Sequence, residues 1–137
     1  MFVDTDVTLD LLMERTPHFA DAVRLFGLIQ DGAVRGCTSA LSFANLHYLL
    51  TRAIGRGRAL DALRKLRLLL SVVAVDERAV DAALSSAFSD FEDALQHYAA
   101  VAARAGAIVT RNKGDYKHST VPALLPGEYL AQQSRPD

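Results

Sequence analysis

Acidic residues are concentrated at three places along the chain. They are Asp4 and Asp6 in MFVDTDV, Asp90, Glu92 and Asp93 in DFEDALQHYAA, and Asp115 in TRNKGDY. Two carboxylates about 4 Å apart repel each other by about 4 kcal/mol at an effective dielectric constant of about 20, so a cluster needs a counter-charge. A divalent cation supplies that charge, and oxygen-only ligands select hard ions such as Mg²⁺ or Mn²⁺. Such an ion neutralises phosphate oxygens and activates a bound water, which is the chemistry of phosphoryl transfer.

The composition indicates one compact domain with a substantial core. The chain has 137 residues, enough for one domain and too few for two ordinary ones, and half of them are hydrophobic. A net charge of -1 excludes a strongly basic protein of the histone or ribosomal kind. It does not exclude a nucleic-acid enzyme, because a local basic rim can hold a phosphate backbone. The single cysteine, Cys37, rules out an intrachain disulfide and a cysteine-based zinc site.

The sequence shows no sign of a membrane segment or a signal peptide. No apolar run reaches the ~20 residues that a membrane-spanning helix needs. Asp4 and Asp6 stand where a signal peptide would carry Lys or Arg followed by an apolar stretch. We therefore expect a cytoplasmic protein with no membrane partner.

Short apolar strands are predicted to alternate with amphipathic helices. The expected strands lie at 1–3, 34–39, 72–75 and 107–110, and the expected helices at 7–15, 18–32, 40–55, 58–70, 77–88 and 91–106. Asp76 is expected to cap the helix that follows it, and 121–133 to form a short extended piece and a final helix with Pro126 near its start. This alternation predicts an α/β fold with a central parallel sheet covered on both faces. We expect a single domain over 1–137, with a loose tail at 131–137.

The three acidic segments are predicted to meet at one edge of the sheet. Asp4 directly follows the first strand, and Thr110, Asn112 and Asp115 follow the strand at 107–110. In open α/β sheets, ligands bind beyond the carboxyl ends of the strands. Asp90 and Asp93 share one face of their helix at spacing i, i+3, whereas Glu92 points away from that face.

Simpler interpretations of the same acids remain open at this point. Asp6 could cap the first helix, and Asp90 could cap the helix that begins beside it. Glu92 could be a solvated first-turn acid stabilised by the helix dipole. Asp10 and Asp115 could be ordinary surface acids.

Four motifs in this order resemble the PIN domain family. They are DTDVTLDLLMER, SALSFANLHYLL, DFEDALQHYAA and TRNKGDY, and the resemblance extends from Met1 to about Leu130. More narrowly, the chain resembles the ribonuclease toxins of VapC type in bacterial toxin–antitoxin pairs. The resemblance implies a three-layer α/β/α sandwich, a Mg²⁺ or Mn²⁺ cofactor and hydrolysis of RNA. It also implies a homodimer and a cognate antitoxin that docks beside the acidic pocket.

The resemblance assigns roles residue by residue. It implies metal binding by Asp4, Asp93 and Asp115, to which Asp90 and Asp6 are added as further candidates. Thr110 and Asn112 match the polar positions that line the pocket and orient water or phosphate. Arg111 and Lys113 flank the site and could grip the RNA backbone, although they could equally be ordinary solvated charges.

One position departs from the family pattern. Asn45 stands where most PIN nucleases carry a Glu in the third helix, and Asp90 could restore the missing negative charge. A branch of the family has Asn at this place. Among the histidines only His97 lies near the acids, one helical turn after Asp93, and a surface or packing role is favoured for it.

Two other functions fit parts of the sequence. The first is a degenerate PIN module that binds RNA or protein without cutting, for which Asn45 is the best support. The second is a phosphatase of haloacid-dehalogenase type, in which DTDVT would supply Asp4 as nucleophile and Asp6 as general acid. The short chain and the absence of clear downstream motifs count against the phosphatase.

Overall fold

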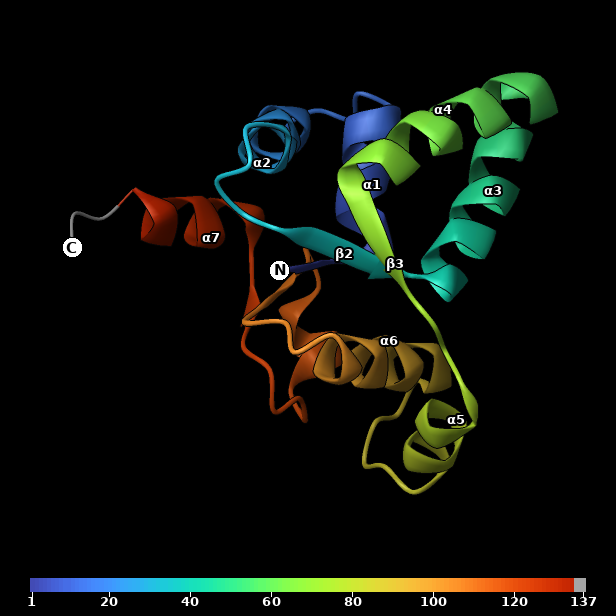
Figure 1. The fold of residues 1–137 in the computed structure, drawn as a ribbon, viewed down its shortest axis with the longest axis vertical. Helices are drawn as coiled ribbons and strands as arrows, with labels where there is room; N and C mark the ends of the chain where they lie inside the picture. Colours follow the sequence, from blue (N-terminus) through green and yellow to red (C-terminus); the bar gives the residue numbers. More distant parts are fainter. Residues whose placement is uncertain (135–137) are drawn as a thin grey trace.

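The fold is built around a sheet of five parallel strands. A computed structural model describes residues 1–134, and the sheet order is β3–β2–β1–β4–β5 (Figure 1). The strands are β1 (Phe2–Val3), β2 (Gly36–Ser39), β3 (Leu70–Val73), β4 (Ile108–Val109) and β5 (Ala123–Leu124). Every neighbouring pair is parallel, as the alternation of strands and helices predicted.

Helices cover both faces of this sheet. They are α1 (Thr5–Leu12), α2 (Phe19–Gln30), α3 (Ala40–Ile54), α4 (Arg56–Leu69), α5 (Glu77–Leu84), α6 (Phe91–Ala102) and α7 (Pro126–Gln133), with a 3₁₀ turn η1 (Lys113–Tyr116). Helices α1 to α4 lie on one side of the sheet, α5 and α6 lie on the other, and α7 packs against α2 (Figure 1). The architecture is therefore the expected three-layer α/β/α sandwich.

The central strands separate two hydrophobic cores. Val3 and Val109 point into the larger core beneath α1 to α4, whereas Phe2 and Ile108 point into the smaller core beneath α6. All four side chains are fully buried. Successive residues of a strand face opposite sides, so a strand covered on both faces must be apolar throughout, as these two are.

Several local signals act as the sequence predicted. The carboxylate of Asp76 accepts from the backbone N–H of Ala79 at 3.1 Å and caps α5. Gly55 ends α3 with a φ of +87°, a conformation that glycine adopts without steric cost. Pro126 is the first residue of α7, where its missing N–H is not needed.

Several predicted boundaries were wrong. Helix α1 ends at Leu12 rather than at about 15, and α6 ends at Ala102 rather than at 106. Strand β3 is Leu70–Val73 rather than 72–75, because it aligns with β2 from the pair Gly36 and Leu70 and follows α4 without a loop. Helix α5 ends at Leu84 rather than 88, where the Ser86 hydroxyl donates to the Ala83 carbonyl. Residues 131–133 belong to α7 and are not a loose tail, whereas 135–137 lie outside the described residues. Within 1–134, no helix combines the length and apolar character needed to cross a bilayer.

Candidate active site

Asp4 lies at the carboxyl end of the central strand β1 and is fixed by contacts to two elements. Its backbone N–H donates to the carbonyl of Val109 at 3.0 Å, which continues the pairing of β1 with β4. One carboxylate oxygen accepts from the N–H of Thr5 at 2.8 Å, and the other accepts from the Thr110 hydroxyl at 2.8 Å. Asp4 is thus the N-cap of α1, and the interpretation of Asp6 as that cap is wrong.

Asp6 binds the loop that follows β4. Its Oδ2 accepts from the backbone N–H of Arg111 at 3.1 Å and from the Asn112 side-chain amide at 2.9 Å. Its Oδ1 is buried and has no hydrogen-bond partner among residues 1–134. Asp6 and Asn112 together hold the loop after β4 against α1, which brings both to the same edge of the sheet as Asp4.

Asp93 contributes a third carboxylate from the other side of the sheet. Asp90 is the N-cap of α6, because its Oδ1 accepts from the N–H of Asp93 at 2.9 Å, so the capping interpretation of Asp90 is confirmed. Burial, with the negative charges of Asp90, Asp115, Asp4 and Glu92, raises the pKa of Asp93 to about 7. The charges that act on Asp93 thus come from the end of β1, from η1 and from its own helix.

The same electrostatic field acts on the neighbouring groups. Burial and the charge of Asp6 raise the pKa of Asp4 to about 6. The Tyr116 side chain on η1 is only 3% exposed, and its hydroxyl has no hydrogen-bond partner in the described part of the chain. Burial and the charges of Asp4 and Asp93 raise the pKa of Tyr116. The Tyr116 hydroxyl therefore belongs to the acidic pocket, although the sequence analysis did not single it out.

Glu92 was expected to be a solvated acid, and it is exposed, but it has a specific partner. The Asn45 amide on α3 donates to the Glu92 carboxylate on α6 at 2.6 Å. The two side chains share a pocket of about 270 Å³ with Thr5, Tyr48 and Leu49. A carboxylate therefore lies beside Asn45 after all, supplied by a different helix. Sequence spacing gave no signal for this pair, because it depends on how two distant helices pack.

A buried polar network supports this side of the site. The Gln96 amide on α6 donates to the Ser42 hydroxyl at 2.8 Å, and the Ser39 hydroxyl donates to the Gln96 carbonyl oxygen. The Thr5 hydroxyl, next to Asp4, donates to Ser42 at 3.3 Å. The network connects α1, α3 and α6, and buried polar groups that are mutually satisfied fix the relative positions of their elements.

The family of the chain follows from its sequence. The sequence model of the PIN domain matches residues 1–114. This chain belongs to the PIN domain family. The match replaces the interpretation of DTDVT as a phosphatase motif of haloacid-dehalogenase type. No curated protein sequence matches the chain.

Two solved structures share the fold of this PIN domain. One is VapBC2 from Rickettsia felis bound to a DNA fragment from their promoter, with 13% sequence identity and a TM-score of 0.66 over 90% of this chain and 96% of that chain. The other is a toxin–antitoxin complex from Klebsiella pneumoniae, with 15% identity and a TM-score of 0.67 over 91% and 96% of the two chains. At these identities the likeness establishes the three-layer fold.

The two basic residues predicted to flank the site, Arg111 and Lys113, both pair with acids in this structure. Asp10 is only 1% exposed, and its carboxylate binds Arg15 Nε at 3.0 Å and Arg111 Nε at 2.7 Å, so the interpretation of Asp10 as a surface acid is wrong. Lys113 pairs with Glu128 at 3.0 Å on the surface. The Arg111 guanidinium, expected to grip RNA, is directed toward the buried Asp10 in this structure.

His97 has a packing role in the PIN domain, one of the two roles favoured from the sequence. It is 3% exposed, and its Nε2 accepts from the backbone N–H of Thr120 at 3.3 Å. Its ring lies 5.0 Å from that of Phe88, and burial lowers its pKa. A buried imidazole whose Nε2 accepts from the Thr120 N–H is not placed to exchange protons with the acidic pocket.

The oxygen atoms of the acidic pocket are suitable ligands for a divalent cation, but they are not arranged to chelate one in this structure. Among residues 1–134, no three acidic, histidine or cysteine side chains are close enough to hold one ion as they stand. The donors are oxygens only, and the buried Oδ1 of Asp6 lacks a partner within that same range. Burial, and after it the charges of neighbouring acids, raises the pKa of both Asp4 and Asp93, so a nearby positive charge would stabilise their ionised forms. A hard cation would supply that charge, and chelation requires side chains to move toward it.

Proposed function

We propose that this PIN domain is a divalent-metal-dependent ribonuclease that acts as the toxin of a toxin–antitoxin pair. The observation that carries the proposal is the approach of acids from separate elements of the fold to Asp93, whose charges add to burial in raising its pKa. Acids that repel one another across a sheet edge reduce the stability of the protein, so their assembly indicates a function. Phosphodiester hydrolysis with Mg²⁺ or Mn²⁺ is the chemistry that such a cluster supports.

Three carboxylates are the main candidates to hold the metal. Asp4, Asp93 and Asp115 would hold Mg²⁺ or Mn²⁺, which when bound supplies an activated water and neutralises charge on phosphate oxygens. Asp6, with its unpartnered Oδ1, is a candidate further ligand. Asp90 contributes charge, while its Oδ1 caps α6.

The polar residues after β4 act through these carboxylates. Thr110 orients Asp4 through its hydroxyl, and Asn112 orients Asp6 through its amide. Glu92 accepts from the Asn45 amide, so its carboxylate lies beside the residue that stands in place of the third-helix glutamate of most PIN nucleases. We therefore propose that Glu92 compensates for Asn45.

The partners follow from the same proposal. The substrate is single-stranded or looped RNA, and the site of action is the cytoplasm. The solved structures that share the fold include toxin–antitoxin assemblies, which supports a cognate antitoxin as partner. A homodimer is part of the proposal.

A nuclease assay on a mixed RNA pool with added Mn²⁺ or Mg²⁺ tests the proposal. Cleavage should disappear with EDTA and in the Asp93→Asn variant. It should persist in Asp81→Asn, which removes one exposed carboxylate from α5 away from the site. Cleavage that survives Asp93→Asn would show that the acidic cluster is not the catalytic site.

The alternative function, a degenerate PIN module that binds RNA without cutting it, has one specific observation in its favour. No three potential ligand side chains within 1–134 chelate an ion as they stand. Such a module would bind RNA in the presence of Mn²⁺ without cutting it, so gel-shift and cleavage measurements on the same RNA separate the two functions.

A further inference from the structure

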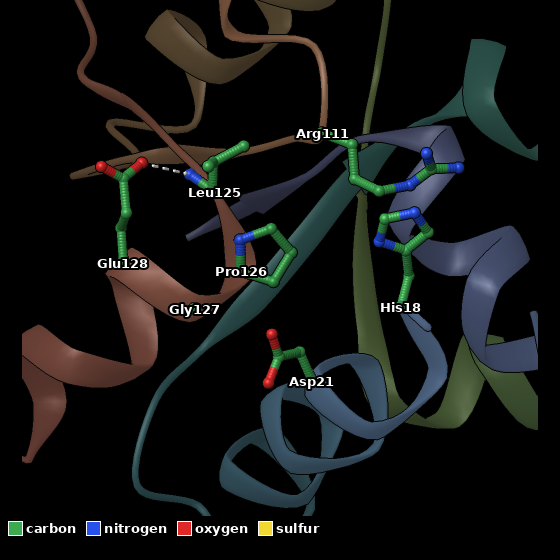
Figure 2. Close-up of a pocket in the computed structure, with 7 residues that line it drawn as sticks. All are labelled: His18, Asp21, Arg111, Leu125, Pro126, Gly127 and Glu128. Carbon is green, nitrogen blue, oxygen red and sulfur yellow. Dashed lines mark hydrogen bonds between the residues drawn. The ribbon is translucent and has the colours of Figure 1, made fainter. Parts of the chain in front are cut away.

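A second pocket lies next to the acidic site. It has a volume of about 410 Å³ and is formed between the start of α2 and the start of α7 (Figure 2). Its walls are His18, Asp21, Arg111, Leu125, Pro126, Gly127 and Glu128. Apart from Arg111, none of these residues is used by the proposed chemistry.

We propose that this pocket receives one unpaired base of the RNA substrate, with guanine as the preferred base. The proposal rests on the ribonuclease function proposed above and adds a determinant of which RNA is cut. The position of the pocket, the flat groups in its wall and its one available carboxylate each support this assignment.

Arg111 places the pocket beside the acids. Its backbone N–H donates to Asp6 at 3.1 Å, and it directly follows Thr110, whose hydroxyl binds Asp4. The side chain of the same residue forms part of the pocket wall. A strand of RNA with a phosphate at the acids can therefore place a neighbouring nucleotide at the pocket.

The pocket wall offers flat surfaces on which a base can stack. The Arg111 guanidinium donates to both oxygens of Asp10, at 2.7 and 3.2 Å, which fixes its plane. The His18 ring lies beside the Arg111 side chain, with the Pro126 ring across the space (Figure 2). Unpaired bases of RNA stack on aromatic rings and on arginine planes.

Asp21 supplies the carboxylate that would read the edge of the base. Its side chain points toward Pro126 and Gly127 (Figure 2), and its nearest cationic group is Arg24 Nη1 at 3.9 Å, so its oxygens can accept further hydrogen bonds. A Cβ at Gly127 would lie 3.4 Å from Asp21 Oδ2, which shows how closely α7 approaches this carboxylate. Guanine presents an N1–H and an amino group side by side, and these two donors match the two oxygens of a carboxylate.

Glu128 is not an equivalent reader, because its carboxylate is already engaged. It accepts from the Leu125 N–H at 2.9 Å and from Lys113 Nζ at 3.0 Å. The other candidate occupant is a basic side chain of a protein partner. A basic side chain would use only the carboxylate of Asp21, whereas a base also uses the flat faces of Arg111, His18 and Pro126.

Fluorescence anisotropy with the full chain in EDTA tests the pocket without cleavage. The probes are labelled uridine oligonucleotides that carry one central guanine, inosine or no substitution. The guanine probe should bind about ten-fold more tightly than the all-uridine probe, as one bidentate base contact allows. Inosine lacks the amino group and should lose most of that preference. Asp21→Asn should also lose it, whereas Asp31→Asn, which removes an exposed carboxylate from the end of α2, should keep it.

Two results would overturn the proposal. One is equal binding of all probes by the native chain. The other is no base preference together with Asp21-dependent binding of arginine amide, which would assign the pocket to a basic side chain. Base-selective binding by a chain that never cleaves RNA with Mn²⁺ would reject the ribonuclease and support the pocket. Cleavage with no base preference in binding would support the ribonuclease and reject the assignment of the pocket.

Discussion

The side-chain amide of Asn45 on α3 lies 2.6 Å from the carboxylate of Glu92 on α6. This contact holds a negative charge beside the position where a carboxylate from the third helix was expected. The contribution of this carboxylate to the site can be tested by exchanging the amide and carboxylate groups of the two residues.

Exchange of the two side chains should preserve metal binding. Glu92→Gln alone should weaken Mn²⁺ binding about ten-fold, the lower end of the effect of losing a supporting group at a metal site. The double variant Asn45→Glu with Glu92→Gln should recover most of it, because the carboxylate returns on the opposite helix. Calorimetric titration with Mn²⁺ gives the affinities, and an unchanged affinity for Glu92→Gln would exclude Glu92 from the site.

Removal of the Thr110 hydroxyl should loosen Asp4. Thr110→Val deletes the donor to Asp4 and the acceptor that receives the Asn112 N–H at 3.0 Å. We expect metal affinity to fall about 10–100-fold and the free energy of unfolding to fall about 1–2 kcal/mol. Thr110→Ser keeps the hydroxyl and should retain both properties. Full metal affinity in Thr110→Val would show that the hydroxyl does not hold Asp4 in the site.

The raised pKa of Asp93 should make the stability of the protein in EDTA depend on pH. Its pKa is raised from 3.8 to about 7, so the folded state binds a proton more tightly than the unfolded state between these values. Stability should therefore fall as the pH rises through this window. Asp93→Asn should flatten the curve and, at pH 8, be more stable than the native chain by on the order of 1 kcal/mol after solvent screening. Thermal unfolding monitored by circular dichroism measures both.

Excess Mn²⁺ should make the native chain more stable than the Asp93→Asn variant at pH 8. A cation that binds only the folded state stabilises it, and its carboxylate ligands must be deprotonated. The native chain should gain stability and Asp93→Asn should gain little. A variant that remains the more stable of the two in Mn²⁺ would contradict metal binding by Asp93.

Asp10 should be essential for stability. It is buried and neutralised by Arg15 and Arg111, so Asp10→Asn leaves two arginines without a counter-charge. We expect a loss of about 2–3 kcal/mol, below the ~3–5 kcal/mol of a fully buried pair, because both arginines are partly exposed. Asp31→Asn, on the surface, should change stability by less than about 0.5 kcal/mol. Urea unfolding of both variants provides the comparison.

The sequence predicted the parts of the site that follow from strand order. Asp4 and Thr110 end neighbouring parallel strands, so the rule for strand ends placed them together before any coordinates were known. The role of Asp90 as the N-cap of α6 was likewise indicated by the residues that follow it in the sequence. Both features follow from a residue's place at the end of a strand or the start of a helix, which the sequence pattern marks.

The parts that could not be predicted depend on how helices pack. Asp10 looks like a surface acid, and only the approach of Arg111 from the far end of the chain makes its burial possible. The contact of Asn45 with Glu92 requires the packing of α3 relative to α6, and Tyr116 lies on a 3₁₀ turn that has no periodic pattern. Pairings between distant segments are set by tertiary packing, which no local spacing records.

The position of β1 at the centre of the sheet has a consequence for synthesis. Its register pairs Phe2 with Cys37 on one side and with Ile108 on the other. A growing chain can thus complete one edge of this strand early, while the other edge waits until more than a hundred residues have been translated. Asp4 meets Thr110 only across that second edge. Nascent chains on the ribosome therefore carry an unassembled candidate site, which is completed only with long-range closure of the sheet.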